Sequence, residues 1–444
     1  MDSNISSLNQ VSAAQQNRIN ILDSLRGIAI LAVFLLNIPF FALPSPASFD
    51  LTLNNEIGTI NEKFWYFSMW FLDGSQRAIL SMLLGAGIII YVARLENKMQ
   101  GSFPAEYFIR RQLWLLVFGL VNAFVFLWPG DILFQYAICG IIIFVFRRLP
   151  VKGLLVAAGI CLIAMTAREN VDLFRQHQRI WKGEVVAKLD SSKTKLTDLQ
   201  KDDLAAMTAF KESSLPAMQK KEMEKNLKQI RGNYSQVYKS QSALGARLHF
   251  YTSYYIIWDT LVFMFIGMAL FKTGILTGAA GTRAYWIFCI AGLGPGLLLS
   301  YFRIQPILTA KFNQFEYTKK IFAEFYEISR VLRSLGIFGL IMLLFKSGWF
   351  DWFFKLMQPV GRMAFTNYLA QSIICAFYFY GFGFGMYGHL QRYEIYYVVA
   401  GVWVLQIIWS HLWLNYYQYG PLEWAWRSLV YWKIIPLGKK SLQI

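Results

Sequence analysis

The sequence predicts an all-α fold, a polytopic transmembrane helical bundle of about ten spans. Hydrophobic residues make up 56% of the 444 and charged residues only 16%, whereas soluble domains average about 25% charged residues. Apolar runs long enough to cross about 30 Å of hydrocarbon recur along the chain. Lysine and arginine gather in alternate short loops, which is the pattern of a multi-pass membrane protein.

Each apolar run is expected to form one membrane-crossing helix. In chain order the predicted spans are 27–43, 78–93, 112–128, 132–146, 151–167, 251–271, 284–302, 334–350, 363–380 and 395–414. The first sixteen residues are polar and show no basic region followed by a small-residue cleavage site, so we expect no signal peptide. The first span is therefore expected to remain in the protein as a membrane helix.

The charge pattern predicts that both termini are cytoplasmic. With the N-terminus inside, every inner loop is basic, from Arg26 in the first to Lys440 in the last, whereas the outer loops 44–63 and 128–131 carry acids. We therefore expect a multi-pass protein of the bacterial inner membrane, in contact with membrane lipids. The formal charge of +17 is explained by this topology, so no nucleic-acid partner is expected.

The chain divides into four parts by polarity. Residues 1–16 form a polar N-terminal tail, 17–167 an N-terminal transmembrane region, 168–250 a polar insert and 251–444 a C-terminal transmembrane region. The insert is rich in Glu and Lys and poor in Gly and Pro, which predicts amphipathic helices, and the span count places it outside the cell. It could cap a site, mediate assembly or be a tolerated insertion.

Asp23 and Arg26 stand just before the first span, and Asn37 lies within its apolar run. At about 100° per residue these three side chains project within about 60° of one another, with Arg26 and Asn37 about 16 Å apart along the helix. Because polar groups facing lipid are costly, this face should point into the protein or into a wet cavity. We expect Arg26 and Asn37 to line one cavity, together with polar groups of the ninth span.

A second pair of charges precedes the second span. Asp73 and Arg77 are four residues apart, and four residues later Ser81 continues the same helix face. The pair is a candidate acid and base at the outer mouth of the bundle, although a surface ion pair explains it equally well. The aromatic run 64–71 just before it is too short to cross and predicts a helix at the outer interface.

Charged residues also enter the eighth span from its outer side. Glu324, Glu327, Arg330 and Arg333 recur every three residues, and Arg333 is the member expected to face the interior and bind an anionic phosphate or carboxylate. Asp259, within the sixth span, is a possible counter-ion.

Two amides occupy one face of the ninth span, Asn367 and Gln371, with Arg362 just before them. They could belong to a binding site, but hydrogen bonding between helices explains them without any chemistry. After the last span, Glu423 and Arg427 are again four residues apart.

Histidine and cysteine give little sign of catalysis or metal binding. His411 is the intramembrane histidine and could be a general base, although a hydrogen-bonded packing role explains it too. The four histidines show no metal-ligand spacing and the four cysteines no C-x-x-C spacing, so we expect no metal site.

Several of these segments together resemble the YeiB-like bacterial membrane family, domain of unknown function 418. They are Arg18–Gly27 with Asn37, Ser81–Gly87, Gly361–Ser372 and Gly420–Arg427. That family is thought to be distantly related to transmembrane acyltransferases such as the lysosomal heparan-α-glucosaminide acetyltransferase and the sugar O-acyltransferases. The resemblance implies transfer of an acyl group from a cytosolic thioester, acyl-CoA or acetyl-CoA, to an acceptor on the other face. The sequence departs from those enzymes in having Asn37 where the O-acyltransferases carry a histidine, and in having no histidine between Leu43 and Arg77.

We therefore expect an acyltransferase-like membrane protein that forms a homo-oligomer. Its expected partners are the acyl donor and an envelope or small polar acceptor. Asp73 is the candidate base, Arg26 and Arg333 would hold anionic groups of the donor, and Asn37 would stabilise the developing oxyanion. The alternatives are a transporter or flippase for a lipid-like or anionic solute, in which the same charges line a path, and a non-catalytic scaffold.

Overall fold

The long apolar runs of the sequence form long helices. The computed structural model describes residues 2–97, 101, 103–189 and 195–438, and its regular elements there are helical. The elements up to the end of the insert are α1 (Asp2–Ala42), α2 (Ser45–Phe49), α3 (Ile60–Phe67), η1 (Ser68–Leu72), α4 (Ser75–Glu96), α5 (Phe103–Phe124), α6 (Leu133–Phe144), η2 (Val145–Arg148), α7 (Val151–Ala187), α8 (Asp198–Ser213), α9 (Pro216–Ile230), α10 (Tyr234–Ala246) and η3 (Arg247–Tyr251). The remaining elements are α11 (Ser253–Lys272), α12 (Thr282–Thr309), α13 (Gln314–Lys320), α14 (Tyr326–Ser347), α15 (Asp351–Arg362), α16 (Ala364–Phe379), α17 (Ile395–Tyr416) and α18 (Pro421–Tyr431). The predicted all-α fold is confirmed.

Seven helical segments of the described chain are long and apolar enough to cross a membrane. They lie at Asn20–Ala42, Ile60–Glu96, Val151–Ala187, Tyr254–Lys272, Thr282–Thr309, Tyr326–Ser347 and Ile395–Tyr416. Each overlaps one of the ten predicted spans, and the chain is accordingly a helical membrane protein. The number of crossings and their orientation stay predictions.

The other three predicted spans form helices that are shorter than expected or begin elsewhere. The run 132–146 forms α6, which has 12 residues, and the run 363–380 forms α16, which has 16. At 1.5 Å per residue these helices are about 18 and 24 Å long, less than the thickness of a hydrocarbon core. The run 112–128 lies mostly in α5, which begins at Phe103 and ends at Phe124.

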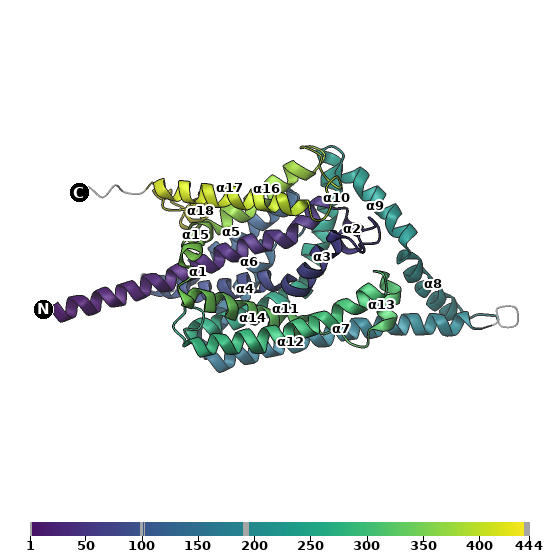
Figure 1. The fold of residues 1–444 in the computed structure, drawn as a ribbon, viewed down its shortest axis with the longest axis horizontal. Helices are drawn as coiled ribbons and strands as arrows, with labels where there is room; N and C mark the ends of the chain where they lie inside the picture. The colour runs from purple at the N-terminus through teal and green to yellow at the C-terminus, as the bar shows by residue number, and fades with distance from the viewer. Residues whose placement is uncertain (1, 98–100, 102, 190–194, 439–444) are drawn as a thin grey trace.

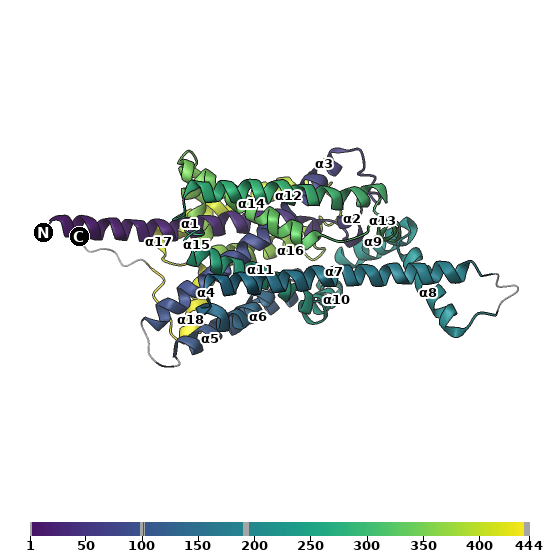
Figure 2. The same ribbon diagram turned by 90° about the horizontal axis from the view of Figure 1, so that it is seen from below.

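Helix α1 runs through the middle of the bundle and packs against α4, α15, α16 and α17 (Figure 1). Its beginning lies at the same end of the molecule as α18, and we call this the terminal end. The helices of the insert lie at the opposite end, which we call the insert end (Figure 2). The long helices of the bundle thus run between the terminal end and the insert end.

Helices α12 and α14 pack closely against each other. A Cβ atom on Gly292 would meet the backbone of Gly336, and one on Gly296 would meet the backbone of Arg333. Because glycine lacks a side chain, the two backbones approach closely, as small residues allow in membrane helix pairs. This packing fixes the position of Arg333 near the insert end.

The described residues of the insert, 168–189 and 195–250, form an arch over the insert end. Helix α7 continues past the predicted end of its span at residue 167 to Ala187, so that its 37 residues extend about 55 Å. Helices α8, α9 and α10 then lead back to the bundle (Figure 1). Two hydrogen bonds join the arch to the C-terminal region. Asn313 Nδ2 donates to the Ser214 carbonyl at 3.0 Å, and Arg231 Nε donates to the Tyr387 carbonyl at 2.8 Å.

Candidate functional site

Two cavities lie one behind the other along α1 and α4. The larger, of about 790 Å³, lies at the insert end, and the smaller, of about 370 Å³, lies at the terminal end. We call them the insert-end cavity and the terminal-end cavity. Both are lined by residues from α1, from α4 and from the C-terminal region, so they depend on the assembly of the whole bundle.

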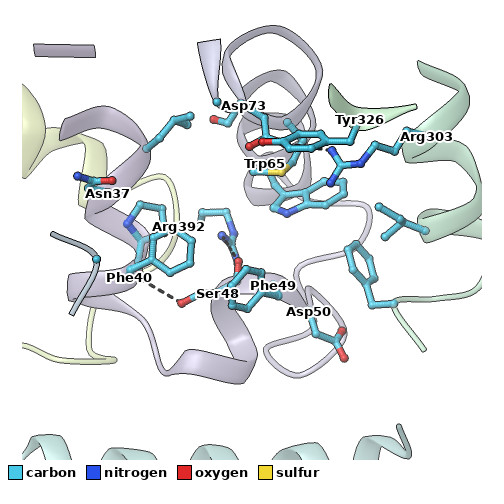
Figure 3. Close-up of a pocket in the computed structure, with 18 of the residues that line it drawn as sticks. Asn37, Phe40, Ser48, Phe49, Asp50, Trp65, Asp73, Arg303, Tyr326 and Arg392 are labelled. Carbon is cyan, nitrogen blue, oxygen red and sulfur yellow. Dashed lines mark hydrogen bonds and ion pairs between the residues drawn. The ribbon is translucent and has the colours of Figure 1, made fainter. Parts of the chain in front are cut away.

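The insert-end cavity combines charged groups with aromatic walls. Asn37 comes from α1, Asp73 from the corner before α4, and Arg303 and Tyr326 from the α12 and α14 side (Figure 3). The aromatic lining includes Phe40, Phe49, Trp65, Phe312, Tyr317 and Tyr396, and the arch contributes Ser214 and Gln219. The arch therefore forms part of the cavity wall.

Asp73 lies on a sharp corner between η1 and α4. Gly74 takes the left-handed conformation, φ +74°, and a side chain there would collide with Arg330. Asp73 Oδ2 accepts a hydrogen bond from Arg303 Nη1 at 3.0 Å, and the Arg303 guanidinium lies 4.4 Å from the centre of the Tyr326 ring. The corner thus presents a carboxylate to the cavity, held by an arginine from α12.

The corner also explains why the predicted ion pair of Asp73 with Arg77 is wrong. Helix α4 begins at Ser75, so Asp73 lies outside the helix and does not share a face with Arg77. Arg77 Nη2 instead donates to Asp259 Oδ2 at 2.8 Å, and Asp259 also pairs with the buried Arg330. Asp73 and Arg77 both line the insert-end cavity, but they belong to two separate ion pairs.

Arg333 does not bind an open anion site, contrary to expectation. Its side chain is 1% exposed and donates to the carbonyls of Trp70 and Asp73 and to the hydroxyls of Ser75 and Ser300. Asp259 is likewise the partner of Arg77 and Arg330 rather than of Arg333. Three of these four acceptors, Trp70, Asp73 and Ser75, belong to the Asp73 corner or border it, so Arg333 holds that corner in place.

The terminal-end cavity is rich in arginine. Its lining includes Arg26, Arg94, Arg111, Arg362 and Arg427. Among the described residues, Arg26 is the member of this set that pairs with a carboxylate, through Asp23 Oδ1 at 2.8 Å. Several positive charges therefore border this cavity without a carboxylate partner in the described chain.

Aromatic rings hold two of these arginines. The Arg111 guanidinium lies 4.0 Å from the Trp426 ring centre and 4.6 Å from the Tyr91 ring centre. Arg427 lies 4.4 Å from the centre of the Tyr419 ring. Such stacking fixes the guanidinium plane and leaves its N–H groups at the edge free to donate to an anion.

The predicted shared cavity of Arg26 and Asn37 is wrong. Arg26 lines the terminal-end cavity and Asn37 the insert-end cavity. The two side chains do lie on one polar stripe of α1, but they are about 16 Å apart along the helix. The wall between the cavities crosses that stripe between Ile30 and Val33.

Glu423 lines the terminal-end cavity but does not pair with Arg427 as predicted. Its Oε1 accepts from the backbone N–H groups of Phe365 at 2.8 Å and Thr366 at 3.1 Å, and its Oε2 accepts from the Thr366 hydroxyl at 2.5 Å. Glu423 therefore caps α16 by accepting from N–H groups of its first turn, which have no partner within the helix. Burial raises the pKa of Glu423 above its ordinary value, although these hydrogen bonds lower it.

The ninth-span amides and His411 lie outside both cavities. Asn367 Nδ2 donates to Ser410 Oγ at 3.1 Å, and Gln371 Nε2 donates to Gln406 Oε1 at 3.0 Å, so both amides join α16 to α17. His411 Nδ1 lies 2.9 Å from the Ile407 carbonyl one turn earlier in its own helix. The packing interpretation holds for all three, and their assignment to a site is not supported.

Comparison with known proteins shows which proteins the chain resembles. Residues 270–433 match the model of the family described as "Protein of unknown function (DUF418)". The chain is 26% identical to the uncharacterized protein YxaH of Bacillus subtilis over 96% of this chain and 97% of the relative, and 28% identical to the uncharacterized protein YeiB of Escherichia coli over 92% and 95%. The chain is thus similar to the DUF418 family over residues 270–433, and to YxaH and YeiB over nearly its whole length. No solved structure matches it.

The DUF418 segment supplies residues to both cavities. It contributes Arg303 to the insert-end cavity, and Arg362, Glu423 and Arg427 to the terminal-end cavity. The alignments with YxaH and YeiB extend over nearly the whole chain, so they also include α1 and α4, which line both cavities.

Sequence reasoning did not identify several cavity residues of this protein. Arg303 lies one residue beyond the predicted seventh span, and an arginine at that position is a signal that could have marked it. Arg94 and Arg111 were counted toward the basic inner loops, although the structure places both on the terminal-end cavity. Within the described ranges, no group of three His, Cys, Asp or Glu side chains is arranged to hold a metal ion.

Proposed function

We propose that the chain transfers an acyl group from a thioester donor bound in the terminal-end cavity to an acceptor bound in the insert-end cavity. The supporting observation is the presence of two cavities of different chemistry at opposite ends of one bundle. Combined with the basic loops of the terminal end, the proposal places the donor on the cytoplasmic side of a bacterial inner membrane.

The terminal-end cavity has the charge needed for an anionic donor. A thioester of the acyl-CoA type carries phosphates, and guanidinium groups bind phosphate by charge-assisted, often bidentate hydrogen bonds. Arg111 and Arg427 are the best placed residues for this role, because aromatic rings already fix their guanidinium planes. Arg26 would add to the positive charge of the cavity, reduced by its pairing with Asp23.

The insert-end cavity offers the groups that acyl transfer needs. Asp73 would accept the proton of an acceptor hydroxyl or amine, whose oxygen or nitrogen forms the new bond to the acyl carbon. The carbon–sulfur bond breaks, and the thiolate takes up the proton from Asp73, so that the products are an acylated acceptor and a free thiol. The Asn37 amide is the candidate donor to the oxyanion that develops during this step.

Covalent transfer can be tested with the full chain in detergent. Radiolabelled acetyl-CoA is supplied with hydroxyl- and amine-bearing acceptors such as glucose, glucosamine, glycerol and phosphatidylethanolamine, and both free thiol and labelled acceptor are measured. Asp73→Asn should lower turnover about 10²- to 10⁴-fold, because it removes the proton-accepting carboxylate. Asp351→Asn, an exposed carboxyl at the start of α15 and outside both cavities, should match the wild type.

Two results would contradict the proposal. Wild-type turnover in Asp73→Asn would remove Asp73 as the base. Movement of an anionic solute across sealed vesicles without modification, and without thiol release in detergent, would favour the second candidate function, a transporter. The placement of the two cavities in line through the bundle is the observation that favours this candidate.

A further inference from the structure

The two cavities are separated by a wall about one side chain thick. On α1 the lining changes from the terminal-end cavity at Ile30 to the insert-end cavity at Val33, and on α4 it changes from Leu80 to Arg77. Each change takes three residues, which corresponds to a rise of about 4.5 Å. Ile132 lines both cavities at once.

The backbone at Ile132 is held firmly. Its N–H donates to the Tyr368 hydroxyl at 3.1 Å, and the preceding residue, Asp131, accepts from Asn122 Nδ2 at 2.8 Å and from the Phe134 N–H at 3.0 Å. Trp128, at the start of the same turn, stacks on Phe41 of α1 with ring centres 3.9 Å apart. The turn between α5 and α6 is thus fixed to α1 and α16, and it holds position 132 between the cavities.

The side chain of Ile132 is buried in the core at a position outside the interior of α6. It is 9% exposed, and it occupies the position just before the first turn of α6, with φ −104°, rather than the helix interior. A β-branched side chain inside a helix is largely restricted to one χ1 rotamer, and that restriction is weaker outside the helix. Rotation about χ1 can therefore change the width of the wall without moving the turn.

We infer that the Ile132 side chain is the barrier between the two cavities, and that its displacement joins them into one passage wide enough for an extended, unbranched group. In terms of the proposed function, on which this inference rests, position 132 decides which acyl chains reach Asp73 and Asn37. A larger side chain closes the passage, and a smaller one admits bulkier acyl groups.

The barrier can be tested by access, independently of any reaction. Ile132→Cys is made in the full chain in sealed vesicles, and a small membrane-impermeant thiol reagent is added to either side. Label should enter position 132 from both sides. Val33→Cys should label from the insert side and Ile30→Cys from the terminal side, since each lines one cavity. The wild type, whose four cysteines are free and buried, gives the background.

Labelling of Ile132→Cys from one side only, or from neither side while both controls label, would overturn the inference. Ile132→Trp supplies a second measurement, because it should lower transfer of an acetyl group at least tenfold while leaving binding of coenzyme A at the terminal end within twofold of wild type. Two-sided labelling without any acyl transfer by the wild type would retain the barrier and reject the proposed function, so the two failures are distinguishable.

Discussion

Arg111 offers the most direct test of anion binding at the terminal end. Its guanidinium lies between the rings of Trp426 and Tyr91, and within the described chain it forms no ion pair. Its N–H groups are therefore available to a ligand phosphate. Arg111→Gln removes the charge while keeping much of the length of the side chain, so the aromatic groove loses its cation without a large change in volume.

The expected loss of affinity follows from the bonds that Arg111 can form. A hydrogen bond to a charged group contributes about 1.5–3 kcal/mol, and each 1.4 kcal/mol corresponds to a tenfold change in Kd, so Arg111→Gln should weaken binding about 10- to 150-fold. The assay is calorimetric titration of coenzyme A into the purified full chain in lipid nanodiscs, at about 50 and 200 mM salt. Between these salt concentrations, the affinity of the wild type for coenzyme A should fall more than that of Arg111→Gln, because salt screens the charge that the variant lacks.

The neighbouring arginine provides the control. Arg110 pairs with Glu106 and donates to the Val430 carbonyl, and it does not line the cavity. Arg110→Gln removes the same charge one residue away and should keep wild-type affinity within about twofold. Unchanged affinity in Arg111→Gln, or an equal loss in both variants, would refute the assignment of the terminal-end cavity to an anionic ligand.

Three further predictions concern topology, packing and pH. Reporter fusions after Gly438 and within the 168–250 insert should report from opposite sides of the membrane, and a report from the same side would contradict the predicted orientation. Gly361→Ala should lower the melting temperature by several degrees, because its Cβ would meet the Asp23 carbonyl where α15 crosses α1, whereas Gly401→Ala, on an open face of α17, should be neutral in the same thermal-unfolding assay. Burial raises the pKa of Glu423 in the folded chain above 4.5, so the folded chain holds this proton more tightly than the unfolded chain does. The melting temperature of the wild type should therefore fall as the pH rises above about 4.5. Melting curves of Glu423→Gln should lack this part of the pH dependence.

Some features of the site could be predicted from local pattern alone. The composition, apolar runs and basic loops determine that the chain is a helical membrane protein, because helix formation and partitioning into lipid depend on residues that are close in sequence. The polar stripe of α1 was predicted in the same way, and both Arg26 and Asn37 do line cavities. Asp73 was predicted at the outer mouth of the bundle with Arg77 as its partner; it lines the insert-end cavity and pairs with Arg303 instead.

The tertiary structure alone decided which charges meet. Asp73 and Arg77 looked like partners by spacing, but the left-handed Gly74 ends the helical register between them, and Asp73 pairs with Arg303, 230 residues later in the chain. Likewise the residues of one polar stripe on α1 line two separate cavities, because Ile132, from another part of the chain, lies between these cavities. Sequence periodicity specifies the faces of single helices, whereas the contacts between faces depend on close packing of segments far apart in sequence, and no local pattern encodes that packing.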